Sequence, residues 1–129
     1  MSKKNDYNQL PHVSPTVGQE VSCVMNGVKQ EYLKDNQKLR DFLRKVLIGR
    51  NFNILDESFK EFSPQGVTIY FLLSESHASI HTYPEHDCLH LSIYSCRGPK
   101  DAEPIFDAIK KELKPKKIIY EVINQVPLI

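Results

Sequence analysis

The sequence lacks the features that mark several common classes of protein. It has no tryptophan and only three cysteines, Cys23, Cys88 and Cys96, with no CxxC pair among them. This odd set fits reduced thiols better than a disulfide framework or a thiolate zinc site. No apolar run approaches the roughly 18 residues that a membrane-spanning helix needs, and the first residues contain no apolar core of a signal peptide. We therefore expect a cytoplasmic protein with no membrane segment.

A strong excess of one charge is also missing. The formal net charge is +1, from 17 basic and 16 acidic side chains. This balance creates no general field for nucleic acid or an anionic membrane, so we expect neither as a partner. A length of 129 residues predicts one domain. Residues 1–17 are polar and without periodicity, which predicts a flexible N-terminal arm before a single domain at 18–129.

The hydrophobic pattern predicts two helices and a series of strands. Helical spacing of apolar residues predicts helices at 29–49 and 101–113, the second with Asp101 as N-cap and Pro104 in its first turn. The strands are expected at 20–27, 51–62, 67–75, 77–84, 88–96 and 116–124. Residues 67–75 are almost continuously apolar, which predicts a central strand buried on both faces.

This order predicts an α+β fold. Its architecture is a two-layer sandwich, with a largely antiparallel sheet and two helices on one face. The other sheet face has no predicted cover. An uncovered apolar sheet face favours a homodimer with an αββα arrangement, or a ligand cleft between sheets.

The stretch LLSESHASIHTYPEHDC, residues 72–88, places many reactive side chains in a predicted strand hairpin. One interpretation is purely structural, because His77, Ser79 and His81 share one face of a strand and a polar face is usually solvated. A second is a metal clip, but His77 and His81 lie about 13 Å apart on an extended strand.

Nucleophilic chemistry is the third interpretation of this stretch. Ser74, Ser76 or Cys96 would serve as the nucleophile beside a base. The sequence contains no GxSxG elbow to present a serine, and nothing in it orients the base. From residue types and spacing alone, the three interpretations stay open.

The segment ESHASIHTYPE, residues 75–85, resembles the cleavage-site motif of the S-adenosylmethionine decarboxylase proenzymes of bacteria and archaea. The likeness extends to FSPQGV at 62–67 and to YSCRG at 94–98, and covers about residues 51–113. It implies a self-processing, pyruvoyl-dependent carboxy-lyase. Its product, decarboxylated S-adenosylmethionine, is the aminopropyl donor for spermidine synthesis in polyamine biosynthesis.

The resemblance also implies a role for each residue of the processing chemistry. The chain would cut itself between Glu75 and Ser76, giving chains 1–75 and 76–129, and Ser76 would become the covalent pyruvoyl group. That carbonyl forms a Schiff base with the substrate amine and draws electrons from the bond that releases CO₂. His81 matches the proton acceptor in processing, and Cys96 matches the proton donor in catalysis.

Substrate binding is implied in the same way. Phe62 matches the aromatic side chain that stacks on adenine, and Glu85 matches the carboxylate that binds the ribose hydroxyls. The family site is shared between two protomers, with the pyruvoyl group and the cysteine from one and the aromatic, histidine and glutamate from the other. The implied partners are a small-molecule substrate and a second copy of the chain, with further assembly open. The implied site contains no metal, and the resemblance assigns no role to Ser74, His77 or His86.

Three departures from the family pattern bear on function. Thr68 replaces a serine that aids processing, and Arg97 is inserted between the cysteine and the glycine of YSCRG. In the first strand, Val24 stands at an acidic position and Asn26 at an aromatic one. Val24 and Asn26 motivate a second hypothesis, a pyruvoyl-dependent arginine or ornithine decarboxylase. Thr68 and Arg97 motivate a third, an uncleaved regulatory homologue.

Overall fold

The computed structural model describes residues 17–127, so the predicted arm at residues 1–17 lies almost entirely outside the described residues. The helices are α2 (Gln30–Leu33), α3 (Asn36–Gly49) and α4 (Glu103–Leu113), and a 3-10 turn, η1, spans Pro84–His86. The strands are β1 (Gly18–Asn26), β2 (Ile54–Glu61), β3 (Val67–Leu73), β4 (Ser76–Tyr83), β5 (Cys88–Ser95) and β6 (Lys117–Gln125).

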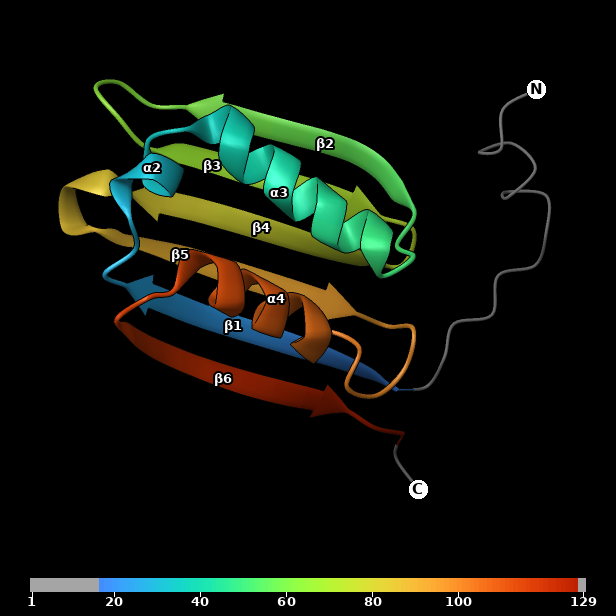
Figure 1. Ribbon diagram of the computed structural model, residues 1–129. Helices are drawn as coiled ribbons and strands as arrows, with labels where there is room; N and C mark the ends of the chain where they lie inside the picture. Colours follow the sequence, from blue (N-terminus) through green and yellow to red (C-terminus); the bar gives the residue numbers. More distant parts are fainter. Residues whose placement is uncertain (1–16, 128–129) are drawn as a thin grey trace, which may run out of the picture.

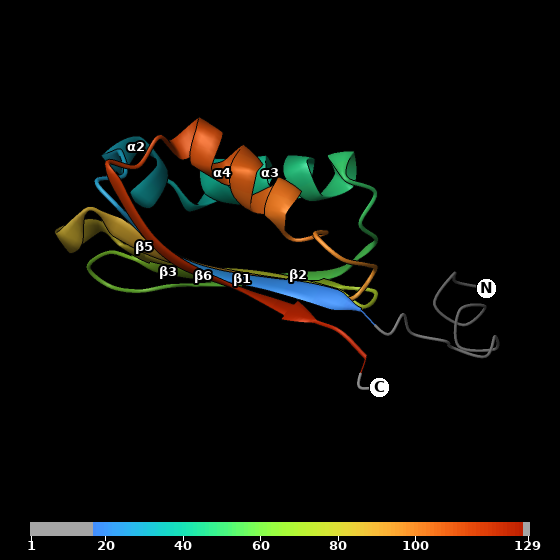
Figure 2. The same cartoon turned by 90° about the horizontal axis from the view of Figure 1, so that it is seen from below.

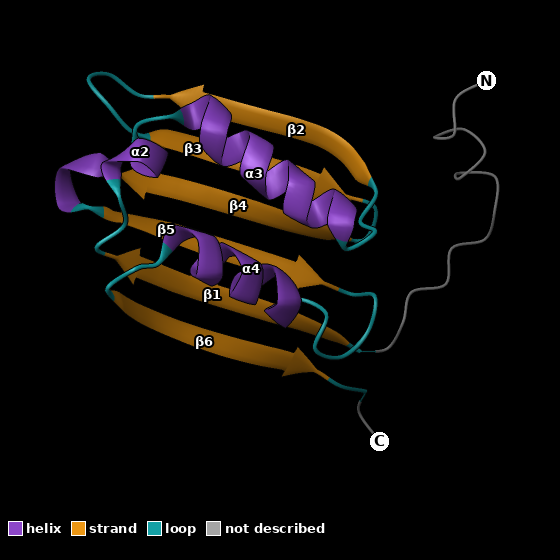
Figure 3. Ribbon diagram, in the orientation of Figure 1, coloured by secondary structure: helices purple, strands orange, loops and turns teal. Residues whose placement is uncertain are grey.

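All six strands form one sheet in the order β2-β3-β4-β5-β1-β6, and every neighbouring pair is antiparallel (Figure 1). Helices α3 and α4 lie on the same face of this sheet (Figure 2). Within residues 17–127 no helix covers the opposite face, which we call the helix-free face (Figure 2). Figure 3 shows the helices in front of the strands, on the face turned to the viewer. The arrangement confirms the predicted two-layer α+β sandwich.

Apolar stripes on the two helices explain the layering. Leu39, Leu43 and Leu47 recur every fourth residue along α3 and are fully buried. In α4, Ile105 and Ile109 show the same spacing and burial. Side chains of this kind each contribute about 1.5–3 kcal/mol when they leave water, so these stripes fix both helices on the sheet.

The predicted helix at 29–49 is interrupted. The Asp35 side chain accepts a hydrogen bond of 3.0 Å from the backbone N–H of Lys38, which starts α3 anew after the single turn of α2. The predicted N-cap of α4 is wrong, because Asp101 bonds to other side chains. The buried amide of Gln19 instead accepts from the backbone N–H groups of Ala102 (3.1 Å) and Glu103 (2.9 Å).

The prediction that residues 67–75 are buried on both faces is also wrong for the single chain. Strand β3 is second from the sheet edge, and only alternate residues such as Ile69 and Phe71 face the helices and are buried. Tyr70 and Leu72 point to the helix-free face and are 40% and 42% exposed. The continuous hydrophobicity of this strand therefore leaves apolar side chains on a face that the single chain does not cover.

Candidate functional site

The predicted site residues form two groups at opposite ends of β4. Ser76 begins the strand and His81 follows five residues later, so their backbones lie about 16 Å apart. Their side chains also point to opposite faces, because Ser76 is buried on the helix side and His81 follows the buried Ile80. One chain thus does not bring the predicted nucleophile and the predicted proton acceptor together.

The first group, the serine group, consists of Glu75, Ser76 and Cys96. Antiparallel pairing of β4 with β5 places Ser76 opposite Ser95, so Cys96 lies beside the Glu75–Ser76 peptide. The Cys96 thiol donates to the carbonyl oxygen of Glu75 at 2.5 Å and lies 3.5 Å from its carboxylate. The backbone N–H of Cys96 donates to Ser76 Oγ at 3.4 Å. The structure therefore joins these three residues at the expected bond.

The surroundings of Cys96 keep its thiol protonated. Burial raises the pKa of the thiol above its ordinary value of 9.0, and the neighbouring Glu75 raises it further. At neutral pH the side chain is therefore a proton donor. An activated cysteine nucleophile shows the opposite shift, towards the thiolate.

The second group, the histidine group, consists of Phe62, Thr68, His81 and Glu85. Thr68 pairs with His81 across β3 and β4, and a hydrogen bond of 2.9 Å joins Thr68 Oγ1 to His81 Nδ1. The threonine thus places a hydroxyl against the imidazole ring. Burial lowers the pKa of His81 below 6.5, and His90 on the next strand adds to the shift. His81 is therefore neutral at pH 7, as a proton acceptor must be.

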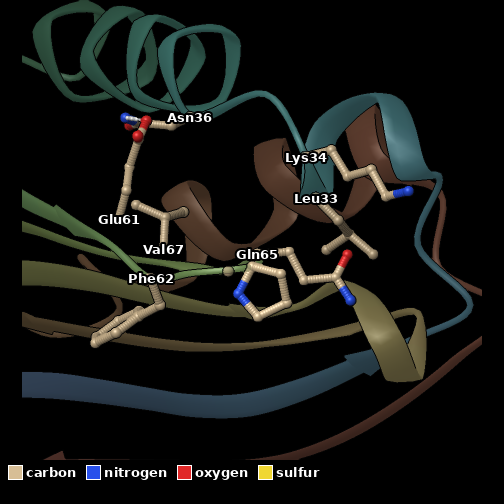
Figure 4. Close-up of a pocket in the computed structure, with 9 residues that line it drawn as sticks. Leu33, Lys34, Asn36, Glu61, Phe62, Gln65 and Val67 are labelled. Carbon is tan, nitrogen blue, oxygen red and sulfur yellow. Dashed lines mark hydrogen bonds between the residues drawn. The ribbon is translucent and has the colours of Figure 1, made fainter.

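A cavity of about 330 Å³ joins the members of the histidine group, and its lining includes Phe62, Thr68, His81 and Glu85. Phe62 is 51% exposed, and Glu85 is exposed in η1. Phe62 also borders a neighbouring pocket formed with Leu33, but its ring points away from that residue (Figure 4). The aromatic face and the carboxylate are therefore open to a ligand.

The side chains left without a role in the sequence have structural partners. Ser74 Oγ accepts a hydrogen bond from Asn53 at 2.8 Å. On the helix-free face, the ring of His77 lies between those of Tyr70 and Tyr94, with centroids 5.9 Å from each. His86 is exposed in η1. Within residues 17–127, no group of three or more His, Cys, Asp or Glu side chains is placed to hold a metal ion.

Several contacts in and around the site were not predicted from the sequence. His90 neighbours His81 and lies opposite Val24 of β1. The inserted Arg97 donates to the backbone carbonyls of Arg50 and Asn51. The backbone partners of Arg97, and Val24 opposite His90, are more than 40 residues away in the chain, so spacing gives no local signal for these contacts.

The family model described as S-adenosylmethionine decarboxylase matches residues 19–125. The chain belongs to the S-adenosylmethionine decarboxylase family. The match runs from β1 to β6 and so includes both groups of site residues. It also includes the three departures, at Thr68, at Arg97 and in the first strand, so this chain carries them within the matched region.

Individual members of the S-adenosylmethionine decarboxylase family are similar to this chain over most of its length. An S-adenosylmethionine decarboxylase proenzyme of Brevibacillus brevis is 37% identical over 102 residues, covering 79% of this chain and 77% of the relative. The proenzyme of Archaeoglobus fulgidus is 29% identical over 109 residues, covering 84% and 97%. The crystal structure of the adenosylmethionine decarboxylase from Aquifex aeolicus superposes with a TM-score of 0.79 at 28% identity, covering 90% of this chain and 95% of that one.

None of the helices in the described part of the chain is long and apolar enough to cross a bilayer.

Proposed function

We propose that this chain is a self-processing decarboxylase that acts on S-adenosylmethionine. It cleaves itself between Glu75 and Ser76, gains a pyruvoyl group at position 76, and produces the aminopropyl donor used to make spermidine. The observation that carries the proposal is the position of the Cys96 thiol, 2.5 Å from the carbonyl oxygen of the bond to be cut. The choice of S-adenosylmethionine as substrate rests on membership of the family.

The first step of processing uses groups that the structure brings together. The Ser76 hydroxyl attacks the carbonyl carbon of Glu75, the C–N bond breaks, and the Glu75 acyl group moves from nitrogen to oxygen as an ester. Negative charge develops on the Glu75 carbonyl oxygen during this attack. The thiol of Cys96 already donates to that oxygen, so it stabilises the charge in the way that an oxyanion-hole donor does.

The second step removes the α-proton of Ser76 and expels the Glu75 carboxylate, which leaves dehydroalanine. Its enamine becomes an imine, and water then replaces the nitrogen, which departs as ammonia and leaves the pyruvoyl carbonyl. His81 is the proton acceptor, because its lowered pKa keeps it neutral and Thr68 fixes its ring.

The length of β4 supports a site that two copies share. Because His81 is about 16 Å from Ser76 in the same chain, the acceptor comes from a second copy. Two copies packed through their helix-free faces form the αββα arrangement. This face carries exposed apolar side chains, which a dimer buries: Tyr70, Leu72, Tyr83, Ile119 and Ile123.

The residues of the serine group fit a carbonyl at position 76. Ser76 is only 8% exposed, and the protonated Cys96 is its neighbour through the 3.4 Å contact. A pyruvoyl group held there by Ser76 and Cys96 would supply a carbonyl able to condense with the substrate amine and to take up the electron pair released with CO₂. Cys96 then delivers a proton to the substrate carbon. Phe62 stacks on the adenine, while Glu85 accepts hydrogen bonds from the ribose hydroxyls.

Release of labelled CO₂ tests the substrate. S-adenosylmethionine, arginine and ornithine, each labelled in the carboxyl group, are incubated separately with the purified protein. The proposal expects release from S-adenosylmethionine at least 100-fold above the other two.

One observation favours the second candidate, an arginine or ornithine decarboxylase: Val24 sets an apolar side chain beside His90, where the family has an acidic residue. Release from arginine or ornithine alone establishes that candidate and overturns the proposed substrate.

A further inference from the structure

The loop that follows β5 is tied to the segment between α3 and β2 by a single side chain. Arg97 donates to the backbone carbonyls of Asn51 (3.0 Å) and Arg50 (2.9 Å). Its guanidinium also lies 3.6 Å from the ring centre of Phe52, a buried residue. On the other side it forms an ion pair of 2.7 Å with Asp101. Arg97 therefore links its own loop to residues 50–52.

The same segment holds the turn that precedes the cleavage bond. The Asn53 side chain donates to Ser74 Oγ at 2.8 Å, and the backbone N–H of Ser74 donates to the Asn53 carbonyl at 3.1 Å. Ser74 lies two residues before Ser76. Residues 50–53 thus hold the cleavage turn through Asn53 and the thiol loop through Arg97.

Asp101 fixes the residues on both sides of Cys96. Ser95 Oγ donates to Asp101 at 2.5 Å, and Arg97 donates to Asp101 through Nε and Nη2. The backbone N–H of Arg97 also donates to Ser95 Oγ at 3.3 Å. Cys96 lies between these two anchored residues, so its backbone has little freedom to turn the thiol away from Glu75.

This arrangement contributes more to orientation than to stability. The side chains of Arg97 and Asp101 are 33% and 23% exposed, and ion pairs near the surface contribute little to folding. A planar guanidinium that donates to two carbonyls and one carboxylate, however, makes all of these hydrogen bonds in only one orientation. A lysine would keep the charge but could not reproduce this fork.

We propose that Arg97 is a positioning residue that holds the Cys96 thiol at the reacting position. The inference rests on the proposed function, because it assumes that Cys96 donates a proton there. The insertion of Arg97 lengthens the loop after Cys96 relative to the family pattern, and the Arg97 side chain anchors this longer loop.

The test compares Arg97→Ala and Arg97→Lys with Lys100→Gln, a control that removes the same charge from an exposed position of the same loop. Turnover is expressed per pyruvoyl group, counted with a carbonyl-reactive label. We expect kcat to fall between about 10-fold and about 100-fold in Arg97→Ala, as misplaced reacting groups do, with KM changed less than about threefold. Arg97→Lys should recover only part of kcat, and Lys100→Gln should match the wild type.

A second measurement does not depend on decarboxylation. In a Ser76→Ala background the chain stays whole, and iodoacetamide labelling is mapped at Cys96 and at the buried Cys23. Arg97→Ala should speed labelling of Cys96 severalfold and leave Cys23 unchanged. Equal acceleration at both cysteines would show unfolding and overturn the inference, and so would a lower kcat without faster labelling of Cys96.

The two proposals fail in different ways. A wild-type chain that is never cleaved and releases no CO₂ contradicts the proposed function, while the labelling comparison still decides whether Arg97 orients the thiol. A wild-type chain that is fully active, with an Arg97→Ala variant equal to it in kcat and in Cys96 labelling, contradicts this inference alone.

Discussion

Thr68→Val removes one hydroxyl group and keeps the shape of the side chain. Thr68 Oγ1 and His81 Nδ1 are 2.9 Å apart, on neighbouring strands that face each other in register. Valine leaves Nδ1 without that partner and frees the imidazole ring to turn. Because valine favours strands as threonine does, the melting temperature should change little.

The size of the effect follows from the energy of one hydrogen bond. Such a bond contributes about 0.5–1.5 kcal/mol net, and about 1.4 kcal/mol corresponds to a tenfold change in rate. Self-cleavage of Thr68→Val should therefore be slower by about 2-fold to about 13-fold. Thr68→Ser keeps the hydroxyl and loses only a methyl group, so it should process within about twofold of the wild type.

Cell-free synthesis followed by intact-mass analysis at set times gives the rate of self-cleavage for each variant. Equal rates for Thr68→Val and the wild type would refute the role given to the Thr68 hydroxyl. Slow cleavage in Thr68→Ser together with normal cleavage in Thr68→Val would show that the methyl group, and not the hydrogen bond, orients His81.

Three further predictions follow from the same site. Cys96→Ala should lose at least about 100-fold in decarboxylation per pyruvoyl group; turnover equal to the wild type would remove the assigned proton donor. The acid limb of self-cleavage should lie below pH 6.5, because burial and His90 lower the pKa of His81 and the neutral ring is the form that accepts the proton. The alkaline limb of decarboxylation should lie above pH 9.0, because burial and Glu75 raise the pKa of the Cys96 thiol and keep it protonated. Rates measured over pH locate both limbs, and an acid limb above pH 6.5 would contradict the role of His81. Leu72→Lys, on the helix-free face, should yield monomers and slow self-cleavage, whereas Ile48→Lys, on the exposed side of α3, should leave the dimer and the cleavage rate unchanged. Sedimentation distinguishes monomer from dimer, and a dimeric Leu72→Lys variant would place the interface elsewhere.

The fold was predictable where periodicity carried the information. The buried stripe at Leu39, Leu43 and Leu47 marks α3 in the sequence, and alternation marks β4 and β5. The cap of α4 was not predictable, because Gln19 reaches it from a strand more than 80 residues earlier. Capping depends on which side chain the tertiary fold brings near, so a local candidate such as Asp101 can be drawn to another partner.

For the site, too, local motifs were predictable from the sequence and contacts between distant residues were not. The motif around Glu75–Ser76 named the reacting residues, and the structure joins Glu75, Ser76 and Cys96 as that motif implies. The separation of about 16 Å between the backbones of Ser76 and His81 depends on β4 beginning at Ser76 itself and running on past His81, which the predicted strand at 77–84 did not include. The ties made by Arg97 connect residues 46 and 47 positions apart, and no local pattern in the sequence encodes them.

Self-cleavage is the central claim, and the intact mass of the purified wild-type chain tests it most directly. The account predicts two components, residues 1–75 and residues 76–129, the second beginning with a pyruvoyl group that reacts with a carbonyl label. A Ser76→Ala chain prepared in the same way should stay whole. A wild-type sample that contains only the uncut 129-residue chain after long incubation would contradict the account.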